Sequence, residues 1–338
     1  MKNAKKGISA IIAAAAVALS LGGQVFAQQS RAGQIKDVQD AIRQKGARWV
    51  AGETSVSNLP EDEWRYKVGL NFTELKGTPI EGLDDRGLPK AVDWRDNGGN
   101  YVTPVRDQKR CGGCWAFSMT GGLEAYVLRT TRQSGRNLDL SEQVMISCSG
   151  VGSCDGGTLN PDYLATTGLP EESAYPYAAA NGTCSAAASG WQNNTYTIGA
   201  WGSVPHTVAG MKAALVKYGP LPTALMVYED LMHYKSGVYS YTTGKKLGGH
   251  AVLLVGYDDA NQCFIVKNSW NTGWGEAGYF RIAYSELTSP VSFGISTVAY
   301  KALNKGEADL KRQASPLDGR ADAWTRVETM VAPALSWN

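Results

Sequence analysis

Two cysteines, a histidine and an asparagine are the residues of this chain whose types and spacing could do chemistry together. The cysteines lie in Cys111-Gly112-Gly113-Cys114-Trp115-Ala116-Phe117, which is followed much later by Gly249-His250-Ala251 and then by Asn268-Ser269-Trp270. A histidine beside a cysteine can take the thiol proton and leave the reactive thiolate. An asparagine can hold the second ring nitrogen of that histidine. The spacing therefore predicts Cys114 as a nucleophile, His250 as its base and Asn268 as the residue that orients the base.

Three features are expected to lower the pKa of the Cys114 thiol, which is about 8.5 when free. A helix is predicted to begin at Cys114, and the positive end of its dipole favours an anion. The imidazolium of His250 should favour the thiolate more strongly than the dipole does, and Asn268 would fix the tautomer of that ring. Gln108 could donate its side-chain N–H to the oxyanion formed by attack on a carbonyl group, with the backbone N–H of Cys114 as the second donor.

Each of these residues also has a simpler interpretation. A Cys-x-x-Cys pair can be a redox dithiol or half of a zinc site, but no strand–helix redox unit surrounds this pair and no second pair has zinc spacing. His250 could be a hydrogen-bonded core histidine on an apolar strand, and Gln108 could belong to a surface loop. The chain has only 3 histidines, and the neighbours of His250 favour the catalytic role. No metal and no cofactor are expected.

Composition and the first residues indicate an exported protein. Lys plus Arg number 33 and Asp plus Glu 31, so the net charge of +2 does not suggest a nucleic-acid or membrane-surface partner. Residues 1–27 carry early lysines, an apolar run and the sequence Val25-Phe26-Ala27, which is typical of a signal peptide. The alternative, a membrane helix, is disfavoured because the apolar run is short. Export would permit disulfides among the 6 cysteines.

The rest of the chain divides into a leader, a main unit and a tail. Residues 28–87 are too apolar for a simple linker, with one helix predicted near 35–42 and another from about Pro60 to Gly69. From Leu88 onward helices come first, over Cys114 to about Arg129, Ser141 to Met145 and Gly210 to Tyr218. Strands follow over Ala251 to Tyr257, Cys263 to Lys267 and Gly278 to Ala283. This order predicts two subdomains. Residues 302–338 are rich in charge, and their role is not predicted.

Residues 88–300 resemble papain-like cysteine peptidases of the cathepsin group. The matching segments, in order, are Val92-Asp93-Trp94-Arg95, Val102-Thr103-Pro104-Val105, Gln108, the Cys114 motif, Leu140-Ser141-Glu142-Gln143, Cys154-Asp155-Gly156-Gly157, Tyr175-Pro176-Tyr177, Gly249-His250-Ala251 and Lys267-Asn268-Ser269-Trp270-Asn271-Thr272-Gly273-Trp274-Gly275. The resemblance implies an α+β fold of two domains. A helical domain over about 88–205 would pack on an antiparallel β-barrel-like domain over about 206–301, with the active site in the cleft between them and Trp270 over the His–Asn pair.

The resemblance also selects a disulfide pattern and identifies departures from the family. With Cys114 free and Cys263 interpreted as a buried thiol, the four other cysteines allow three pairings, and the family pattern implies Cys111–Cys154 and Cys148–Cys184. Gly113 stands where Ser or Ala is usual. Asn271 replaces a usual Gly, and Asp155 replaces a usual Asn.

The resemblance further implies a function, which is hydrolysis of peptide bonds by a secreted or periplasmic cysteine endopeptidase. Residues 28–87 would be an inhibitory propeptide, because Trp49-Val50-Ala51-Gly52 is similar to short cathepsin-B-type propeptides that block the cleft. The substrate-binding residues would be Gly156, Gly157, Leu159, Ala224, Ala251, Val298 and Trp270. Their apolar side chains predict a preference for apolar residues at P2, the second residue before the cut bond. The expected partners are peptide substrates and the propeptide, and the enzyme is expected to be a monomer. Two alternatives stay open: an inactive homologue that binds other molecules, and a transpeptidase or ligase with the same thioester chemistry.

Overall fold

A computed structural model describes residues 31–301 of the chain. No helix in this part is both long and apolar enough to cross a bilayer. The signal peptide predicted over 1–27 and the tail at 302–338 lie outside the described residues. A first helix covers residues 31–45. The other helices and 3₁₀ turns are η1 (Glu61–Lys67), α2 (Cys114–Thr130), α3 (Glu142–Cys148), α4 (Asp162–Thr166), η2 (Glu172–Ala174), η3 (Cys184–Ala186), η4 (Trp191–Asn193), α5 (Val208–Tyr218), η5 (Glu229–His233) and η6 (Tyr284–Leu287).

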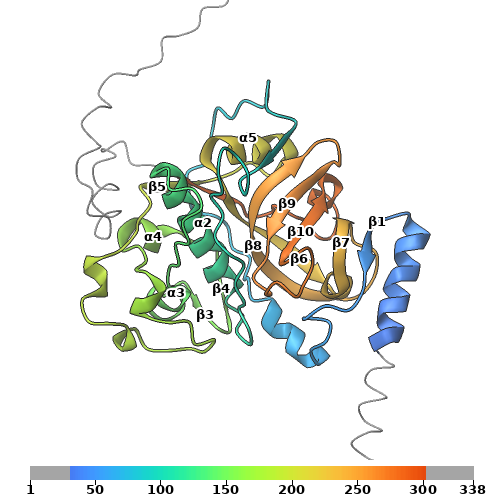
Figure 1. Ribbon diagram of the computed structural model, residues 1–338, viewed down its shortest axis with the longest axis horizontal. Coiled ribbons are helices and arrows are strands. Elements are labelled where there is room, and N and C mark those ends of the chain that lie inside the picture. The colour runs from blue at the N-terminus through green and yellow to red at the C-terminus, as the bar shows by residue number, and fades with distance from the viewer. Residues whose placement is uncertain (1–30, 302–338) are drawn as a thin grey trace, which may run out of the picture.

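The strands form one large sheet and two small ones (Figure 1). They are β1 (Arg48–Ala51), β2 (Ala91–Asp93), β3 (Gly152–Ser153), β4 (Gly156–Gly157), β5 (Ala200–Ser203), β6 (Leu221–Tyr228), β7 (Tyr234–Tyr239), β8 (Lys246–Asp258), β9 (Cys263–Lys267), β10 (Tyr279–Ala283) and β11 (Val298–Lys301). The large sheet has the order β1-β7-β10-β9-β8-β2, and β6 also pairs with β8. Within residues 31–301 all pairs of this sheet are antiparallel except β7 with β10.

The leader docks on the edge of this sheet. Its first helix buries Ile35, Val38 and Ile42 at helical spacing, as predicted. β1 then pairs antiparallel with β7, which places the buried Trp49 ring 5.2 Å from the ring of Tyr239. The helix predicted from Pro60 is the 3₁₀ helix η1, and the chain leaves it toward the boundary between the helices and the sheet (Figure 1).

The helical half is built around α2. Apolar and small side chains cover this helix on all sides, so it is buried along nearly its whole length. α3 packs beside it, and the Ser141 side chain accepts a hydrogen bond from the Val144 N–H, as expected of an N-cap. Disulfides join Cys111 to Cys154 and Cys148 to Cys184, which are the pairs that the resemblance implied. They tie the loop before α2 and the end of α3 to the segments that follow.

The two halves exchange strands. β2 comes from the first half in sequence but pairs with β8 of the sheet, over Ala91 to Asp93. β11, at the other end of the main unit, returns to pair with β5. Of the predicted elements, β8 begins earlier than Ala251 and α5 begins two residues before Gly210. These exchanges hold α2 against β8, where Ser118 Oγ donates to the Val252 carbonyl at 2.7 Å.

Candidate active site

Cys114 is the first residue of α2, and its side chain is fully buried. Gly112 and Gly113 precede it in a loop that the Cys111–Cys154 disulfide fixes. A Cβ atom at Gly112 would lie 2.8 Å from the Cys154 carbonyl oxygen, so the loop requires glycine there. At Gly113 the nearest atoms would be at 3.2 Å, which is tight but less severe. The first backbone N–H groups of a helix have no partner inside it, so the N–H of Cys114 is available to an incoming anion.

His250 comes from β8, in the sheet half. Its Nε2 lies 2.8 Å from Asn268 Oδ1, and the Trp270 ring stacks on the imidazole with the centroids 4.7 Å apart. Its Nδ1 has no hydrogen-bond partner within residues 31–301. The backbone N–H of the next residue, Ala251, lies within hydrogen-bonding reach of the Cys114 thiol. The structure thus brings the predicted nucleophile, base and orienting residue together from α2, β8 and the end of β9.

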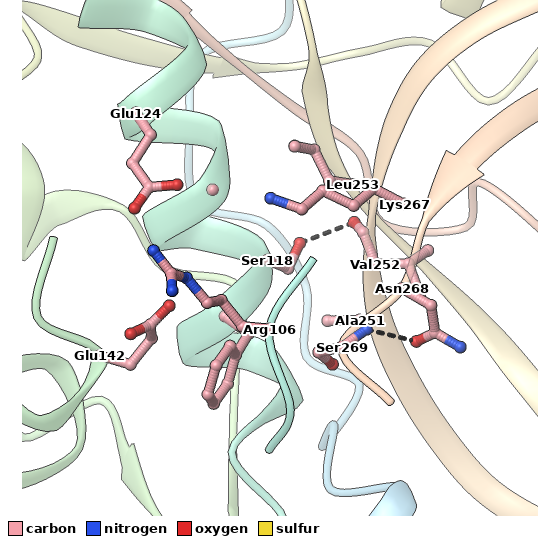
Figure 2. Close-up of a pocket in the computed structure, with 12 residues that line it drawn as sticks. Arg106, Ser118, Glu124, Glu142, Ala251, Val252, Leu253, Lys267, Asn268 and Ser269 are labelled. Atoms are coloured by element: carbon pink, nitrogen blue, oxygen red, sulfur yellow. Dashed lines mark hydrogen bonds between the residues drawn. The ribbon is translucent and has the colours of Figure 1, made fainter. Parts of the chain in front are cut away.

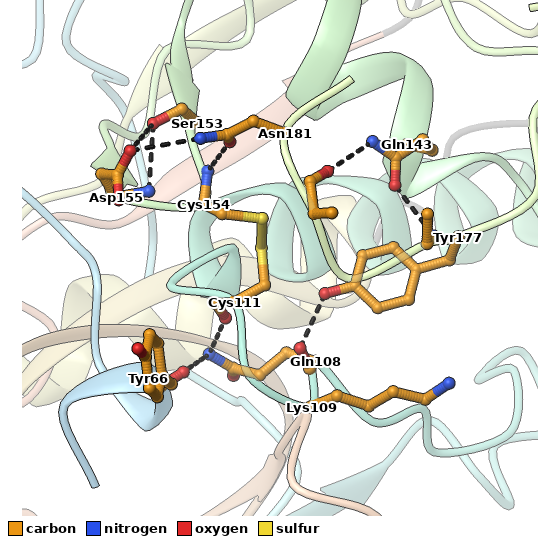
Figure 3. The surroundings of a disulfide bond; sticks show 12 residues. Tyr66, Gln108, Lys109, Cys111, Gln143, Ser153, Cys154, Asp155, Tyr177 and Asn181 are labelled. Atoms are coloured by element: carbon orange, nitrogen blue, oxygen red, sulfur yellow. Dashed lines mark hydrogen bonds between the residues drawn. A yellow bond between two sulfur atoms is a disulfide. The ribbon is translucent and has the colours of Figure 1, made fainter. Parts of the chain in front are cut away.

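Gln108 lies on the loop before the disulfide and is completely buried. Its Oε1 accepts a 2.7 Å hydrogen bond from Ser269 Oγ, which turns the Nε2 group toward the cleft. The backbone carbonyl of Gln108 accepts a 2.7 Å bond from the Tyr177 hydroxyl (Figure 3). Ser269 and Tyr177 were given no role in the sequence prediction. Both belong to segments that matched the family, and that membership was the only signal that could have pointed to them.

A leader carbonyl accepts a hydrogen bond from the side-chain amide of Gln108. Gln108 Nε2 donates to the Tyr66 carbonyl at 2.9 Å, and also to the Cys111 carbonyl at 3.0 Å (Figure 3). The next leader carbonyl, of Lys67, accepts a 3.0 Å bond from Trp270 Nε1. Gln108 Nε2 is the predicted oxyanion donor. The Tyr66 carbonyl of the leader therefore occupies the donor that a substrate carbonyl would use.

The leader main chain continues between the two walls of the cleft. On the helical side, the N–H of Gly157 donates to the Gly69 carbonyl at 2.9 Å and the Gly157 carbonyl accepts from Asn71 N–H at 2.8 Å. On the sheet side, the carbonyl of Gly249 accepts from the N–H groups of Gly69 and Leu70, both at 3.0 Å. Gly69 itself fits only as glycine, because a Cβ atom there would overlap the Gly112 carbonyl oxygen.

Leu70 of the leader is a buried apolar residue. Its side chain is buried in a cluster that contains all four apolar residues predicted to line the P2 pocket, which are Leu159, Ala224, Ala251 and Val298. Gly157 and the left-handed Gly156 flank the same segment, with Asn71 against Gly156. Of the predicted substrate-binding residues, Gly157 is thus hydrogen-bonded to the leader, and the apolar ones share a buried cluster with Leu70.

Burial beneath the leader makes the protonation state of the site the opposite of that predicted from sequence. Loss of solvent raises the pKa of the Cys114 thiol to about 12, although nearby backbone N–H groups act in the other direction. Burial lowers the pKa of His250 to about 4, the Asn268 bond opposes this, and the positive charge of Lys67 lowers the pKa further. The covered site thus favours a neutral thiol and a neutral imidazole instead of the thiolate–imidazolium pair.

A cavity lies between α2 and the sheet, and Asn268 is among the residues that line it (Figure 2). Glu124 and Lys267 point toward each other across it, and both also contact Thr103. Burial raises the pKa of the nearby Glu142 well above its usual range, and the charge of Glu124 adds to this effect. Thr103, which donates to Glu124 and accepts from Lys267, is one of the links between the half that carries Cys114 and the half that carries His250.

Comparisons with known proteins agree with this geometry. Residues 88–301 match the family described as "Papain family cysteine protease". The chain belongs to this family. It is 39% identical over 222 residues to "Cathepsin L-like proteinase" of Fasciola hepatica, a match that covers 61% of this chain and 64% of the relative. It is 35% identical over 280 residues to "Ananain" of Ananas comosus, which covers 80% of this chain and 78% of the relative.

Solved structures of precursors share the fold. The digestive procathepsin L 3 of Tenebrio molitor larval midgut superimposes with a TM-score of 0.68 at 26% identity, covering 80% of this chain and 89% of that one. The digestive procathepsin L2 of the same source has a TM-score of 0.67 at 30% identity, covering 81% and 90%. These comparisons confirm the papain-like α+β fold predicted from the sequence.

The structure accounts for two departures of this papain-family chain from the usual pattern. Asp155 accepts a 3.2 Å hydrogen bond from Asn181, whose Oδ1 in turn accepts from the N–H of Cys154 (Figure 3). Asn271 adopts a left-handed conformation with φ of 57°, and its Oδ1 accepts from Gly273 N–H at 2.7 Å. Asparagine tolerates this region better than most residues, so the turn forms without glycine.

We expect Gly69→Ala to expose the thiol in the full-length chain. The added methyl group would overlap the Gly112 carbonyl, and steric overlap of this kind costs about 1–3 kcal/mol, so the leader should leave the cleft more often. Alkylation of Cys114 by iodoacetamide, measured by intact mass on the unprocessed chain, should then be roughly 10-fold faster. Gly33→Ala is the matched control, because that leader glycine has open space around its Cα. An unchanged rate in Gly69→Ala, or an equal gain in both variants, would contradict this account of the covered site.

Proposed function

We propose that this chain is the latent precursor of an exported cysteine endopeptidase. The Cys114 thiolate attacks the carbonyl carbon of a peptide bond, and the negative oxygen is held by Gln108 Nε2 and the Cys114 N–H. His250, which has taken the thiol proton, passes it to the leaving amine, and a thioester to Cys114 remains. Water, deprotonated by His250, then hydrolyses the thioester. Asn268 keeps the imidazole in the required tautomer, and Trp270 shields that pair.

One observation supports this proposal above all: the leader lies on the groups that a substrate would need. Its Tyr66 carbonyl takes the Gln108 donor, its main chain pairs with Gly157 and Gly249, and Leu70 is buried in the same apolar cluster as the residues proposed to line the P2 pocket. A site with that many groups matched to a peptide is built to bind peptides. The same contacts support an inhibitory role for residues 28–87, with removal near Leu88, where the family match begins. The two disulfides fit an oxidising compartment outside the cytoplasm.

Substitutions in the mature enzyme should separate the proposed roles. Cys114→Ser and His250→Ala should each remove nearly all peptide hydrolysis, because one removes the thiolate and the other its base. Gln108→Ala should lower kcat on the order of 10²–10³-fold through loss of an oxyanion donor. Asn268→Ala should be milder, since it orients the base and transfers no proton. Steady-state kinetics on a fluorogenic peptide test this, with circular dichroism to check folding. Full activity in Cys114→Ser or His250→Ala would refute the assignment.

We expect the mature enzyme to prefer apolar residues at P2. The side chains proposed to line the pocket, Leu159, Ala224, Ala251 and Val298, carry no charge, and Leu70 of the leader is buried in the same apolar cluster. Burying a Leu side chain there contributes about 1.5–3 kcal/mol, whereas an Arg would lose its hydration without a partner.

Peptides that differ only at P2 give the measurement. Leu should exceed Arg by at least roughly tenfold in kcat/KM, equivalent to about 1.4 kcal/mol. A Gln peptide separates polarity from charge and should fall between the two. Comparable turnover of Arg and Leu would show that the pocket is assigned to the wrong residues.

The leader interface also contains a buried histidine that titrates in the acid range. His233 of η5 is 2% exposed and lies under Trp64 of the leader, with the ring centroids 5.8 Å apart. Burial lowers its pKa to about 4, the nearby Glu61 opposes this shift and Arg31 adds to it. Trp64, Glu61 and Arg31 all belong to the leader. A histidine free of the leader should therefore titrate near its usual value of about 6.5.

The sign of the pH effect follows from these values. The leader binds the neutral form of His233, so its affinity is full above about pH 6.5 and falls as the pH drops toward 4. Lowering the pH from 7 to 4 should weaken leader binding by up to roughly 100-fold through this residue. The measurement is the rate of Cys114 labelling by a thiol-reactive epoxide in the precursor, divided by that in the mature enzyme at the same pH. His233→Leu should flatten the pH dependence of this ratio, while His206→Gln should retain it. A steep profile in His233→Leu would assign the effect to other groups.

A further inference from the structure

The charged residue Arg110 lies beside the oxyanion donor and contacts a leader carboxylate. Its Nη1 is 3.3 Å from Glu63 Oε1, and its guanidinium carbon is 5.3 Å from the centroid of the Tyr66 ring. Within residues 31–301, both partners of Arg110 in these contacts belong to the leader. The Arg110 side chain is 64% exposed even in the precursor, so loss of the leader would leave the guanidinium at an open rim of the cleft.

The direction of the leader chain indicates on which side of the cut bond Arg110 lies. In a substrate, the chain runs from the P2 pocket to the carbonyl held by Gln108 and then into the leaving-group side. In the leader, Gly69 and Asn71 pair with Gly157, a predicted substrate-binding residue, and Leu70 is buried in the same apolar cluster as the predicted P2 residues. The Tyr66 carbonyl, which comes earlier in the leader, lies on Gln108, so the leader passes these points in the opposite direction. Residues before Tyr66 therefore lie on the leaving-group side, and Glu63 is among them. Arg110 meets a carboxylate on this side.

The loop that carries Arg110 is held firmly. Gln108 Nε2 donates to the Cys111 carbonyl, and Cys111 is bonded to Cys154. Between them Lys109 adopts φ of 52°, a left-handed conformation that is uncommon for lysine, and its N–H donates to Asp107 Oδ1 at 2.9 Å. Its side chain extends away from Tyr66 (Figure 3). A fixed backbone limits where the guanidinium of Arg110 can reach, so the position can be selective.

We propose that Arg110 is a specificity-determining residue that favours a carboxylate on the leaving-group side of the cut bond. This inference rests on the proposed peptidase function. The carboxylate would be either an acidic side chain or the C-terminal carboxylate of a short substrate. An opposite charge on the same loop, Asp107, accepts hydrogen bonds from the Lys109 N–H and from Asn271 Nδ2 at 3.3 Å, and in the precursor also from the leader's Lys67 Nζ at 3.4 Å. Because Arg110 is exposed, the preference should be roughly two- to fivefold and should weaken at high salt.

The test uses the mature enzyme and peptides with Leu at P2 and a constant acyl side. Glu, Gln or Lys is placed in turn at each of the first three residues after the cut bond, and kcat/KM is measured by chromatography at 50 and 500 mM NaCl. A second set carries Gln throughout and ends in either a carboxylate or a carboxamide. The Gln peptides report on peptidase activity itself, because they do not depend on a charge at Arg110. No cleavage of them would overturn the proposed function, and this inference with it.

Three variants decide the outcome. At one position at least, the wild type should cut Glu over Gln, or carboxylate over carboxamide, roughly two- to fivefold faster. That ratio should fall to about 1 in Arg110→Gln and persist in Arg110→Lys and in the matched control Lys109→Gln. A loss confined to the Glu/Gln ratio identifies a side chain as the ligand, and a loss confined to the terminal pair identifies the C-terminus. Equal ratios in the wild type, or a preference that survives Arg110→Gln, would overturn the proposal.

Discussion

The backbone of residues 69–71, hydrogen-bonded to Gly157 on one wall and Gly249 on the other, determines the state of the whole active site. These bonds close the cleft over Cys114 and His250 and remove both from water. Without water the separated charges of a thiolate and an imidazolium lose their hydration, so the pKa of Cys114 rises and that of His250 falls. The positive charge of Lys67 reinforces the shift at His250. The leader therefore acts on the chemistry of the site as well as on access to it.

The reactive pair also depends on contacts between the two halves, because each half supplies one member. Ser118 of α2 bonds to the Val252 carbonyl, two residues after His250, and Lys267 reaches across to Thr103. The Gln108 loop is tied to the sheet half through Ser269. Each of these bonds is buried, so breaking one would leave polar groups without partners in a place that water does not reach. The strands β2 and β11 each pair with a strand of the other half, so the main chain itself also connects the two halves.

Local patterns predicted the local features of this molecule, and long-range pairing was largely beyond them. The start of α2 at Cys114, the Ser141 cap and the limits of β9 all follow from nearby residues, and the structure has them where the sequence placed them. No local pattern records that β2 pairs with β8, a strand far along the chain. The sequence predicted a lowered pKa for the Cys114 thiol. In the precursor this prediction is wrong, because burial raises that pKa. The leader was predicted to inhibit the enzyme, but the contacts by which it covers Cys114 were not.

The direction of the leader explains how a segment can occupy a substrate site without being a substrate. Its Tyr66 carbonyl accepts from Gln108, as a scissile carbonyl would. In a substrate, the amide nitrogen after that carbonyl lies on the leaving-group side, where the base can protonate it. In the leader that nitrogen belongs to Lys67, and the chain beyond it runs to Gly69 and Leu70 on the acyl side. A thiolate attacking there would have its leaving amine on the wrong side, and the covered site holds little thiolate. In the proposed mechanism, geometry and protonation state thus oppose hydrolysis independently, and we expect release of the leader to remove both obstacles in a single step.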